Sequence, residues 1–533
     1  MTEQTGARII GEALARAGAT HAFGIPGGEV LALMQGLNEA GIDFVLTKHE
    51  NAAGFMAEGL WHATGAPGVL IATLGPGVAN AVNTVANAHQ DKVPLIFLTG
   101  CVDAAEAETY THQIFDHQAL LRPITKASFR ASSGAVGPMI DKAIAIATSG
   151  QPGPVHIDVP IGVAESVSVE PARGHAAPST PAVAQPDAVS AVRDLLENAR
   201  RPIAIAGVDA VNEGAGDAIS AFCRDHHIPL ITTYKGKGLL DETDPLCLGG
   251  AGLSPKADQT LLPLIGKSDC VLLLGYDPIE MRIGWRNPWR ADQPVIEIAQ
   301  TPRTHGMHMV SGTLVSQIED ALSGLGHTAP DRWTGGEITA ARATLAAAFA
   351  PSRWGPGRVF ATLRDEMPDR TVITADSGAH RILLSQMWTC PGPRQFLQST
   401  ALCTMACAVP IAAGYKLGLP DSPVLAFVGD AGLEMGLGEL ATIRDLGLPL
   451  IICVLVDESL GLIELKQRNT QRPVLGVDFG GSEFPAIATA LGGHGVWVDD
   501  EEELREEAQA ALNRDTFTLI AARIGPRAYD GTF

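Results

Sequence analysis

A short glycine-rich run around one aspartate constrains this 533-residue chain more than any other feature. The run Gly429-Asp430-Ala431-Gly432 follows the apolar stretch 424–428, and Asp457 comes directly after a second apolar stretch. This pattern predicts a strand, a tight turn and then a helix over 434–446. Backbone N–H groups of the turn and the positive end of the helix are suited to a diphosphate. Asp430 and Asp457 would hold Mg²⁺, which prefers carboxylate, phosphate and water oxygens.

The composition predicts a large α/β protein. The chain is too long for one hydrophobic core, and 46% of its residues are hydrophobic. Short β-branched runs alternate with amphipathic segments, which favours parallel sheets buried under helices. The formal net charge of −21 argues against nucleic acid and against a membrane as partners, because both require a basic surface.

Two stretches rich in proline, glycine and small residues divide the chain, at 169–186 and at 326–336. Both are typical of extended or turn-rich linkers. They leave three segments, 1–168, 187–325 and 340–533, and each contains several β-branched runs. We therefore predict three doubly wound parallel-sheet α/β domains.

The eight cysteines show no CxxC spacing, which favours reduced thiols over disulfides or a zinc site. The first residues lack the charged and then apolar pattern of a signal peptide. No apolar run is long enough to span a bilayer. We expect a cytoplasmic protein.

A second candidate site is the segment Lys48-His49-Glu50, which follows the strand-like stretch 44–46 and precedes a helix. The Gly429–Gly432 segment resembles the signature of thiamine diphosphate (ThDP) enzymes, and this resemblance implies that a partly buried Glu50 would hydrogen-bond the pyrimidine ring and promote the tautomer that removes the thiazolium proton. The alternative is an ordinary acidic residue at a helix start, where it interacts with the helix dipole.

Together these segments resemble ThDP enzymes of the acetolactate synthase branch, most closely the catabolic, flavin-free acetolactate synthases. The resemblance covers essentially the whole chain and rests on six segments in the family order: 24–28, 48–50, 73–77, 111–126, 275–280 and 429–430. It implies a pyrimidine-binding domain at 1–168, a central domain at 187–325 and a diphosphate- and Mg-binding domain at 340–533.

The resemblance also implies roles for single residues. Glu50 would activate the cofactor, and Gln113 would face the thiazolium and the substrate oxygen. Magnesium would be held by Asp430, Asp457 and the backbone carbonyl of Ser459. The cofactor-binding positions implied in the same way are Gly27, Gly75, Cys403, Met405, Gly429, Ala431, Gly432 and Ile463.

The implied reaction is the decarboxylation of a small, pyruvate-like 2-oxo acid and carboligation of the product to a second carbonyl. In the family Glu50 and the diphosphate site come from different subunits, so the resemblance implies a homodimer or homotetramer. FAD is not predicted, because the segment 206–210 lacks the Gly-x-Gly-x-x-Gly pattern of a dinucleotide site.

Four departures from the family pattern bear on the substrate. Ala431 replaces a glycine and Asp457 replaces an asparagine, while the run 401–407 carries larger residues at glycine-like places, which predicts a tighter pyrimidine pocket. Cys403 and Cys407 in that run are expected to pack rather than react. Glu464 stands where an aliphatic residue is usual and resembles the proton-donating glutamate of pyruvate and indolepyruvate decarboxylases.

Several alternatives stay open from sequence. Glu464 favours a non-ligating 2-oxo acid decarboxylase unless it is an exposed helical glutamate, and the altered glycine run allows a catalytically silent ThDP-binding protein. His112 and His117 could bind a substrate carboxylate or form a polar turn. Arg282 and Arg286 could contact an acceptor carboxylate or lie on the surface. The segment 89–91 is expected to end a helix.

Overall fold

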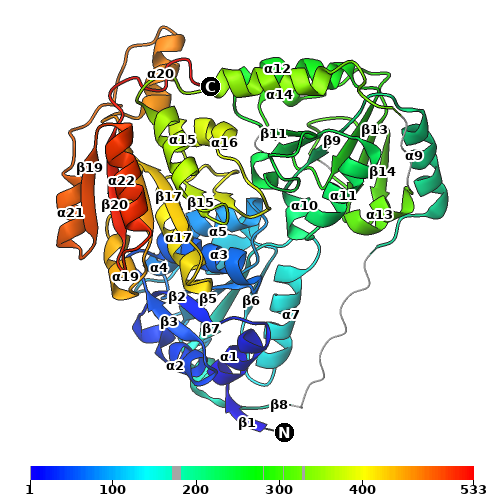
Figure 1. Cartoon of the computed structure of the whole chain (residues 1–533). Helices are drawn as coiled ribbons and strands as arrows, with labels where there is room; N and C mark the ends of the chain where they lie inside the picture. Colours follow the sequence, from blue (N-terminus) through cyan, green and yellow to red (C-terminus); the bar gives the residue numbers. More distant parts are fainter. Residues whose placement is uncertain (1, 171–181, 280, 304, 327–330) are drawn as a thin grey trace.

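Three six-stranded sheets, each covered by helices, make up the molecule (Figure 1). The computed structural model describes residues 2–170, 182–279, 281–303, 305–326 and 331–533. Glu280 and parts of both proposed linkers therefore lie outside the described residues. Every strand pair within the three sheets is parallel, which confirms the predicted fold class.

The N-terminal sheet has the strand order β3-β2-β4-β5-β7-β6. Its central strands are buried along their whole length, as expected for strands covered on both faces. The strands are β2 (His21–Ile25), β3 (Asp43–Leu46), β4 (Gly68–Ala72), β5 (Leu95–Cys101), β6 (Ala127–Arg130) and β7 (Val155–Pro160). The helices are α1 (Gly6–Arg16), α2 (Leu31–Glu39), α3 (Glu50–Thr64), α4 (Pro76–Asn80), α5 (Val82–Gln90), α6 (His117–Leu121), α7 (Val136–Thr148) and α8 (Ile161–Glu165).

The central sheet has the order β11-β10-β9-β12-β13-β14, the doubly wound order of dinucleotide-binding folds. Its strands are β9 (Pro202–Ala206), β10 (Leu230–Thr233), β11 (Cys247–Ala251), β12 (Cys270–Leu274), β13 (Val295–Ala299) and β14 (Gly312–Val315). Its helices are α9 (Pro186–Asn198), α10 (Val208–Asn212), α11 (Gly216–His226), α12 (Pro255–Lys267) and α13 (Ile318–Gly324), followed by α14 (Glu337–Phe349), which packs on α12.

The C-terminal sheet has the order β16-β15-β17-β18-β20-β19. Its strands are β15 (Val372–Ala375), β16 (Phe396–Gln398), β17 (Val424–Gly429), β18 (Ile451–Val456), β19 (His494–Val498) and β20 (Thr518–Arg523). Its helices are α15 (Pro356–Glu366), α16 (Ala379–Met387), α17 (Ala408–Gly418), α18 (Asp430–Gly436), α19 (Glu439–Asp445), α20 (Gly461–Asn469), α21 (Phe484–Ala490) and α22 (Glu501–Ala511).

The N-terminal and C-terminal sheets share one topology. Numbered along the chain, the strands of each run in the order 2-1-3-4-6-5. The direction of winding therefore reverses between β2 and β4 in one sheet and between β15 and β17 in the other. Ligands of open α/β sheets bind at the carboxyl ends of strands at such a switch point. The topology thus marks one candidate site on each of these sheets.

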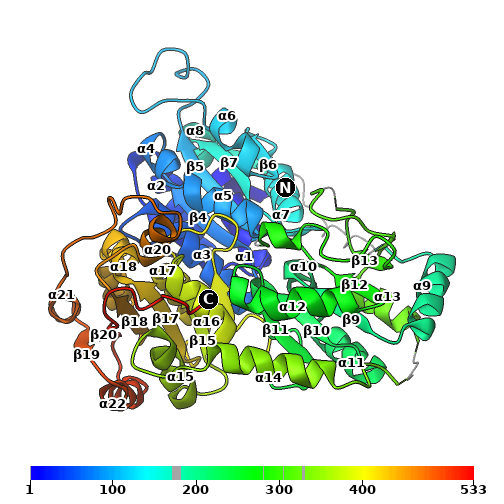
Figure 2. The same ribbon diagram turned by 90° about the horizontal axis from the view of Figure 1, so that it is seen from above.

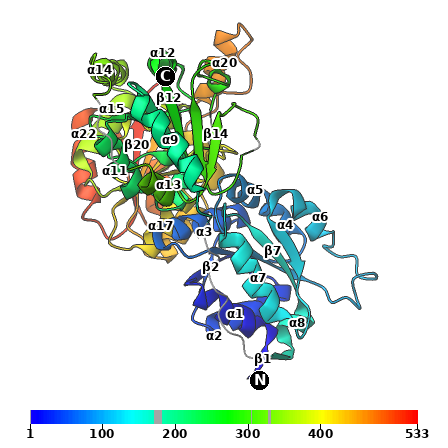
Figure 3. The ribbon, with the colours of Figure 1, turned by 90° about the vertical axis from the view of Figure 1, so that its right-hand side faces the viewer.

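Helices α3 and α17 occupy the same place in the two equivalent topologies and pack against each other at close range. Glycines make this approach possible. A Cβ atom on Gly414 would lie 1.9 Å from the carbonyl oxygen of Met56, and one on Gly59 would lie 2.1 Å from that of Ile411. The crossing therefore joins the N-terminal sheet to the C-terminal sheet, as seen from a second side in Figure 3.

Two sequence expectations need correction. The stretch 169–186 was expected to be a linker from its first residue, but β8 (Val167–Glu170) pairs antiparallel with β1 (Thr2–Thr5). The helix expected over 434–446 begins earlier, at Asp430, and is interrupted between α18 and α19. Gly436 and Gly438 explain the interruption, because glycine is a poor helix former. Within the described part of the chain, no helix is long and apolar enough to cross a membrane.

Substituting Gly414 with alanine should lower the melting temperature, because the added Cβ would clash with the Met56 carbonyl. Overpacking of this kind costs about 1–3 kcal/mol. Gly266→Ala in α12 is the matched control, since nothing lies within 4 Å of its Cβ position and alanine should stabilise a helix by roughly 0.5–1 kcal/mol. Thermal unfolding of both variants checks this, and equal shifts would contradict the close crossing.

Candidate active site

Asp430 lies at the switch point of the C-terminal sheet, directly after β17, and is almost fully buried. One carboxylate oxygen accepts the backbone N–H groups of Asp457, at 3.1 Å, and Glu458, at 2.7 Å. The other accepts the N–H of Ala431 at 2.9 Å. These bonds tie the turn after β17 to the end of β18, so the glycine-rich run and Asp457 do come together.

Asp457 follows β18 directly, is half-buried and lies within electrostatic range of Asp430. Burial and the negative charge of Asp430 raise the pKa of Asp457 to about 8, and burial raises the pKa of Asp430. Carboxylates are among the ligands that Mg²⁺ prefers. Ser459 follows in the same turn, and its hydroxyl donates to Asp478 at 3.0 Å.

Tyr529 closes this turn from the C-terminal end of the chain. The phenol ring is buried and would lie 3.4 Å from a Cβ atom on Gly461. Burial and the charges of Asp457 and Asp430 raise its pKa. The last residues of the chain therefore pack beside these two carboxylates.

Asp376, which the sequence reasoning missed, organises the other side of this switch point. It is fully buried after β15 and accepts the N–H groups of Ala406 and Ala408 at 2.7 Å each. A Cβ atom on Gly432 would lie 2.3 Å from its carboxylate, which explains glycine there. The signal was present, since Asp376 ends an apolar run as Asp430 does.

The backbone of the run 401–407 is left-handed at two of its residues. Cys403 and Ala406 have φ values of 52° and 62°, a left-handed conformation that favours glycine. This agrees with the expectation that larger residues occupy glycine-like places. Cys407 is buried, as expected of a packing residue, whereas Cys403 is exposed. All eight cysteines are free thiols.

A hollow of about 490 Å³ opens beside these turns. Its lining is mostly apolar and comes from α18 and from the segments around Met405 and α20. The lining residues are Met405, Ala431, Glu434, Met435, Leu460, Gly476, Val477, Asp478 and Phe479. Ile463 lies on α20 and is exposed.

Glu50 lies at the switch point of the N-terminal sheet, as the first residue of α3, and is only 5% exposed. Asn80 donates to its carboxylate at 3.0 Å. A Cβ atom on Gly77 would lie 3.3 Å from the other carboxylate oxygen, and one on Gly27 would lie 2.3 Å from the hydroxyl of Thr73. The predicted residues of the first domain therefore gather in one place.

Gln113 lies in the long connection that projects from the N-terminal sheet between β5 and α6 (Figure 2). Its backbone is left-handed, with φ at 59°. A Cβ atom on Gly75 would lie 2.2 Å from the Gln113 carbonyl oxygen. Gly75 and Gln113 are thus in direct contact, and only a glycine permits it.

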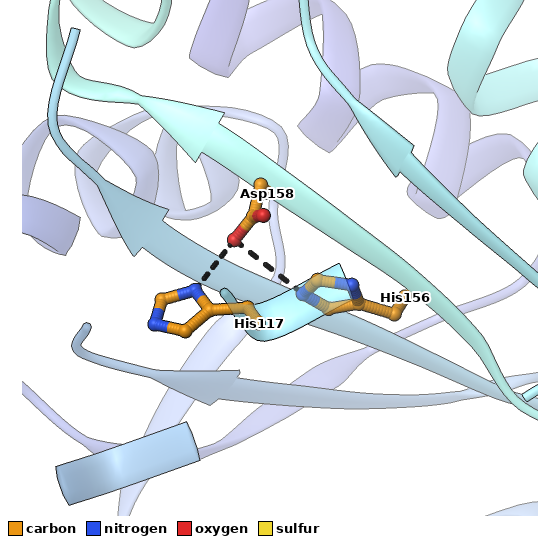
Figure 4. Close-up of side chains that lie close together, drawn as sticks. All are labelled: His117, His156 and Asp158. Carbon is orange, nitrogen blue, oxygen red and sulfur yellow. Dashed lines mark hydrogen bonds and ion pairs between the residues drawn. The ribbon is translucent and has the colours of Figure 1, made fainter. Parts of the chain in front are cut away.

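The position of His117 excludes one of its two sequence interpretations, the binding of a substrate carboxylate. It is buried, and Figure 4 shows it beside His156 and Asp158. Its Nδ1 lies 2.7 Å from Asp158, and its Nε2 accepts the N–H of Gly75 at 3.1 Å. Both ring nitrogens are engaged, so His117 is not free to bind a substrate carboxylate. His112 is exposed in the projecting connection.

Glu464 is not the exposed helical glutamate offered as its alternative interpretation. It is 7% exposed and forms ion pairs with Arg468, at 2.6 Å, and Arg527, at 3.5 Å. Of the two arginines considered for an acceptor carboxylate, Arg282 pairs with Asp258 at 3.1 Å and Arg286 is exposed.

One further group in the central sheet has donors of the kind that bind metals. Glu297, His305 and His308 bring one ligand atom each to within 4.8 Å of the others. However, Nδ1 of His305 already accepts the N–H of Met307, and the charge of Arg303 acts on His308.

The hollow beside the Asp430 turn is lined by segments of the C-terminal sheet. Glu50, at the switch point of the N-terminal sheet, is not among its lining residues. The edges of the N-terminal and C-terminal switch-point groups nevertheless meet. Asn83 donates to Thr404 at 3.2 Å, and the N–H of Lys48 donates to Glu439 at 3.0 Å.

Three family models match the chain in the same order as its sheets. They describe the N-terminal TPP-binding, central and C-terminal TPP-binding domains of thiamine pyrophosphate enzymes, and match residues 4–120, 189–325 and 376–522. The thiamine pyrophosphate of these models is ThDP under its older name.

Curated relatives match along nearly the whole chain. The acetolactate synthase large subunit of Parasynechococcus marenigrum is 30% identical, with 98% of this chain and 87% of the relative covered. The acetolactate synthase of Bacillus subtilis is 27% identical, with 98% and 93% covered. A probable 2-ketoarginine decarboxylase of Pseudomonas aeruginosa is 30% identical, with 96% and 92% covered. The chain belongs to the thiamine pyrophosphate enzymes, in their acetolactate synthase-like family.

Proposed function

We propose that this enzyme uses ThDP and Mg²⁺ to decarboxylate a small, pyruvate-like 2-oxo acid and joins the product to a second carbonyl. The observation that carries the proposal is the buried Asp430 at a switch point, whose carboxylate accepts the N–H of the half-buried Asp457 beside a glycine-rich turn. The proposed domain roles are pyrimidine binding at 1–168, a central domain at 187–325, and diphosphate and magnesium binding at 340–533.

The C-terminal sheet would hold the diphosphate and the metal. Asp430, Asp457 and the carbonyl of Ser459 would bind Mg²⁺, while the turn formed by Gly429, Ala431 and Gly432 would lie against the phosphate oxygens. His380 supports this assignment, since a Cβ atom on Gly429 would lie 3.5 Å from its ring and its buried Nε2 has no hydrogen-bond partner.

The remaining predicted residues would act on the organic part of the cofactor. The carbonyl of Cys403 and the backbone at Met405 would meet the pyrimidine, and Ile463 would close the hollow. When bound, ThDP supplies a sink for the electron pair left when carbon dioxide departs. Glu50 would hold a proton at the pyrimidine ring, with Asn80 fixing its carboxylate, and Gln113 would face the substrate.

A second copy of the chain would complete each site. Glu50 and the Asp430 turn sit on different sheets, and Glu50 does not line the hollow beside that turn. A homodimer or homotetramer in which the N-terminal sheet of one chain faces the C-terminal sheet of another would bring them together. Exposed Tyr110, Ile114 and Phe115, next to Gln113, offer apolar surface for such a contact.

Glu464 bears on the choice between carboligation and simple decarboxylation. A carboxylate held by two guanidinium groups is poorly suited to deliver a proton, which supports carboligation as the first assignment. A non-ligating decarboxylase is the second assignment. Similarity to the probable 2-ketoarginine decarboxylase keeps larger 2-oxo acids among the candidate substrates of this enzyme. The cytoplasmic location stays a prediction.

Magnesium-assisted ThDP binding should tighten as the pH rises toward 8. Asp457 is protonated below its raised pKa of about 8, so each metal bound there must displace one proton. The affinity should therefore rise by up to about tenfold per pH unit between pH 6 and 8. Asp457→Asn, which cannot titrate, should flatten this dependence. ThDP titrations at fixed Mg²⁺ measure it, and equal slopes for both proteins would remove Asp457 from the metal site.

Replacing Glu50 with glutamine should slow both proton exchange at the cofactor's C2 and product formation by roughly 10²–10⁴-fold, the usual contribution of a positioned acid or base. ThDP binding should weaken but stay measurable. Glu39→Gln, an exposed change of the same charge, is the control. Activity of Glu50→Gln equal to that of the control would exclude Glu50 from the chemistry.

Pyruvate, ThDP and Mg²⁺ should give acetolactate as the main product. Glu464→Gln should preserve the product, because the ion-paired carboxylate is not the proton donor in this assignment. Product identification by chromatography decides the matter. Acetaldehyde from the unaltered enzyme would favour the decarboxylase. If neither acetolactate nor acetaldehyde forms, other 2-oxo acids should be tested as substrates.

A further inference from the structure

His117 connects the core of the N-terminal sheet to the loop that carries Gly75. It is the first residue of α6, where Asp116 caps the helix by accepting the N–H of Ala119 at 2.9 Å. The ring points away from solvent toward β5 and β7 (Figure 4). Its two contacts, with Gly75 and Asp158, lie on opposite sides of the ring.

The two contacts fix the tautomer of His117. A backbone N–H can only donate, so Nε2 must carry the lone pair that accepts from Gly75. The proton of the neutral ring is then on Nδ1, where it is donated to Asp158 at 2.7 Å. A histidine tautomer is generally set by the partner of its other nitrogen. Here Asp158 makes Nε2 an acceptor.

Asp158 is itself held rigidly. Thr99 on β5 donates to the same carboxylate oxygen at 2.7 Å, and His156 lies 3.5 Å from it while contacting Ser128 at 2.8 Å through its other nitrogen. Burial acts to raise the pKa of Asp158, but hydrogen bonds from His117 and His156 lower it well below its usual range. The acceptor is therefore an ionised carboxylate anchored on the two strands.

Gly75, which donates to His117, also contacts Gln113. Gly75 is itself left-handed, with φ at 67°, and its Cα faces the Gln113 carbonyl so closely that no side chain fits between them. A shift of the Gly75 amide would therefore displace the Gln113 backbone. Gly75 is the residue before α4 and its carbonyl accepts the N–H of Ala79 at 3.0 Å, whereas Gln113 lies outside any regular strand or helix.

We infer that His117 is a positioning residue, which accepts the Gly75 N–H in a tautomer fixed by Asp158 and so sets the orientation of Gln113 toward the substrate. The inference rests on the proposed function for the role of Gln113. The competing explanation is a buried histidine that contributes stability alone. The two explanations differ in what happens when the two contacts of the ring are removed separately.

Two near-isosteric substitutions separate the contacts. Asparagine places its amide nitrogen near the position of Nδ1, so His117→Asn keeps a donor to Asp158 but removes the acceptor for Gly75. Glutamine extends to the position of Nε2, so His117→Gln keeps an acceptor for Gly75 but removes the donor to Asp158. Leaving the buried Asp158 without that donor should make His117→Gln the less stable variant.

We expect the variant with the higher melting temperature to have the lower activity. His117→Asn should keep most of its melting temperature but lose about 5- to 10-fold in kcat/KM, the loss expected for one hydrogen bond that orients a catalytic group. His117→Gln should melt earlier yet retain kcat/KM near that of the unaltered enzyme. ThDP affinity should be unchanged in both. If His117→Gln, the less stable variant, is also the less active one, the inference is wrong.

Hydrogen exchange provides a readout that does not depend on the substrate. In the full-length protein, peptides covering 74–77 and 102–116 should exchange faster in His117→Asn than in His117→Gln. If the enzyme is inactive on every 2-oxo acid tested while this order of exchange holds, the proposed function fails and the positioning role stands. Equal exchange in the two variants would overturn the positioning role, whatever the activity.

Discussion

The crossing of α3 and α17 is the constraint on which the rest of the structure depends. Two glycines bring the helix backbones into contact, with Gly414 against Met56 and Gly59 against Ile411. Since α3 starts at Glu50 and α17 starts after the run 401–407, this one contact fixes the relative placement of the N-terminal and C-terminal switch points. Larger side chains would separate the sheets and break the contacts between Asn83 and Thr404 at their edges.

The candidate site concentrates unfavourable arrangements that a ligand would relieve. The negative charge of Asp430 raises the pKa of the half-buried Asp457, and Cys403, Ala406 and Gln113 hold left-handed backbones that cost non-glycine residues energy. The structure stabilises these features with backbone donors rather than with other side chains. Asp376 and Asp430 each accept at least two N–H groups, which holds both turns in shape.

The sequence was sufficient to predict the parallel sheets and the strand ends that carry Asp430, Asp457 and Glu50. Those predictions rest on local patterns, namely apolar runs followed by polar residues at strand ends. The roles of Asp376 and His117 could not be predicted in the same way. Asp376 acts on amides some thirty residues away, and the state of His117 depends on strands distant in sequence. Glu464 was recognised as anomalous, but its ion pair with Arg527 comes from a segment distant in sequence.

The position of Tyr529 makes the turn that carries Asp457 depend on the segment 527–530. Its ring covers the start of α20 beside Asp457, and the neighbouring Arg527 and Asp530 pair with Glu464 and Arg468. Removal of this segment would leave the strands of all three sheets in place, since the last of them ends at Arg523. It would nevertheless open Asp457 to bulk water, so a protein of normal secondary structure would have lost the apolar cover of that carboxylate.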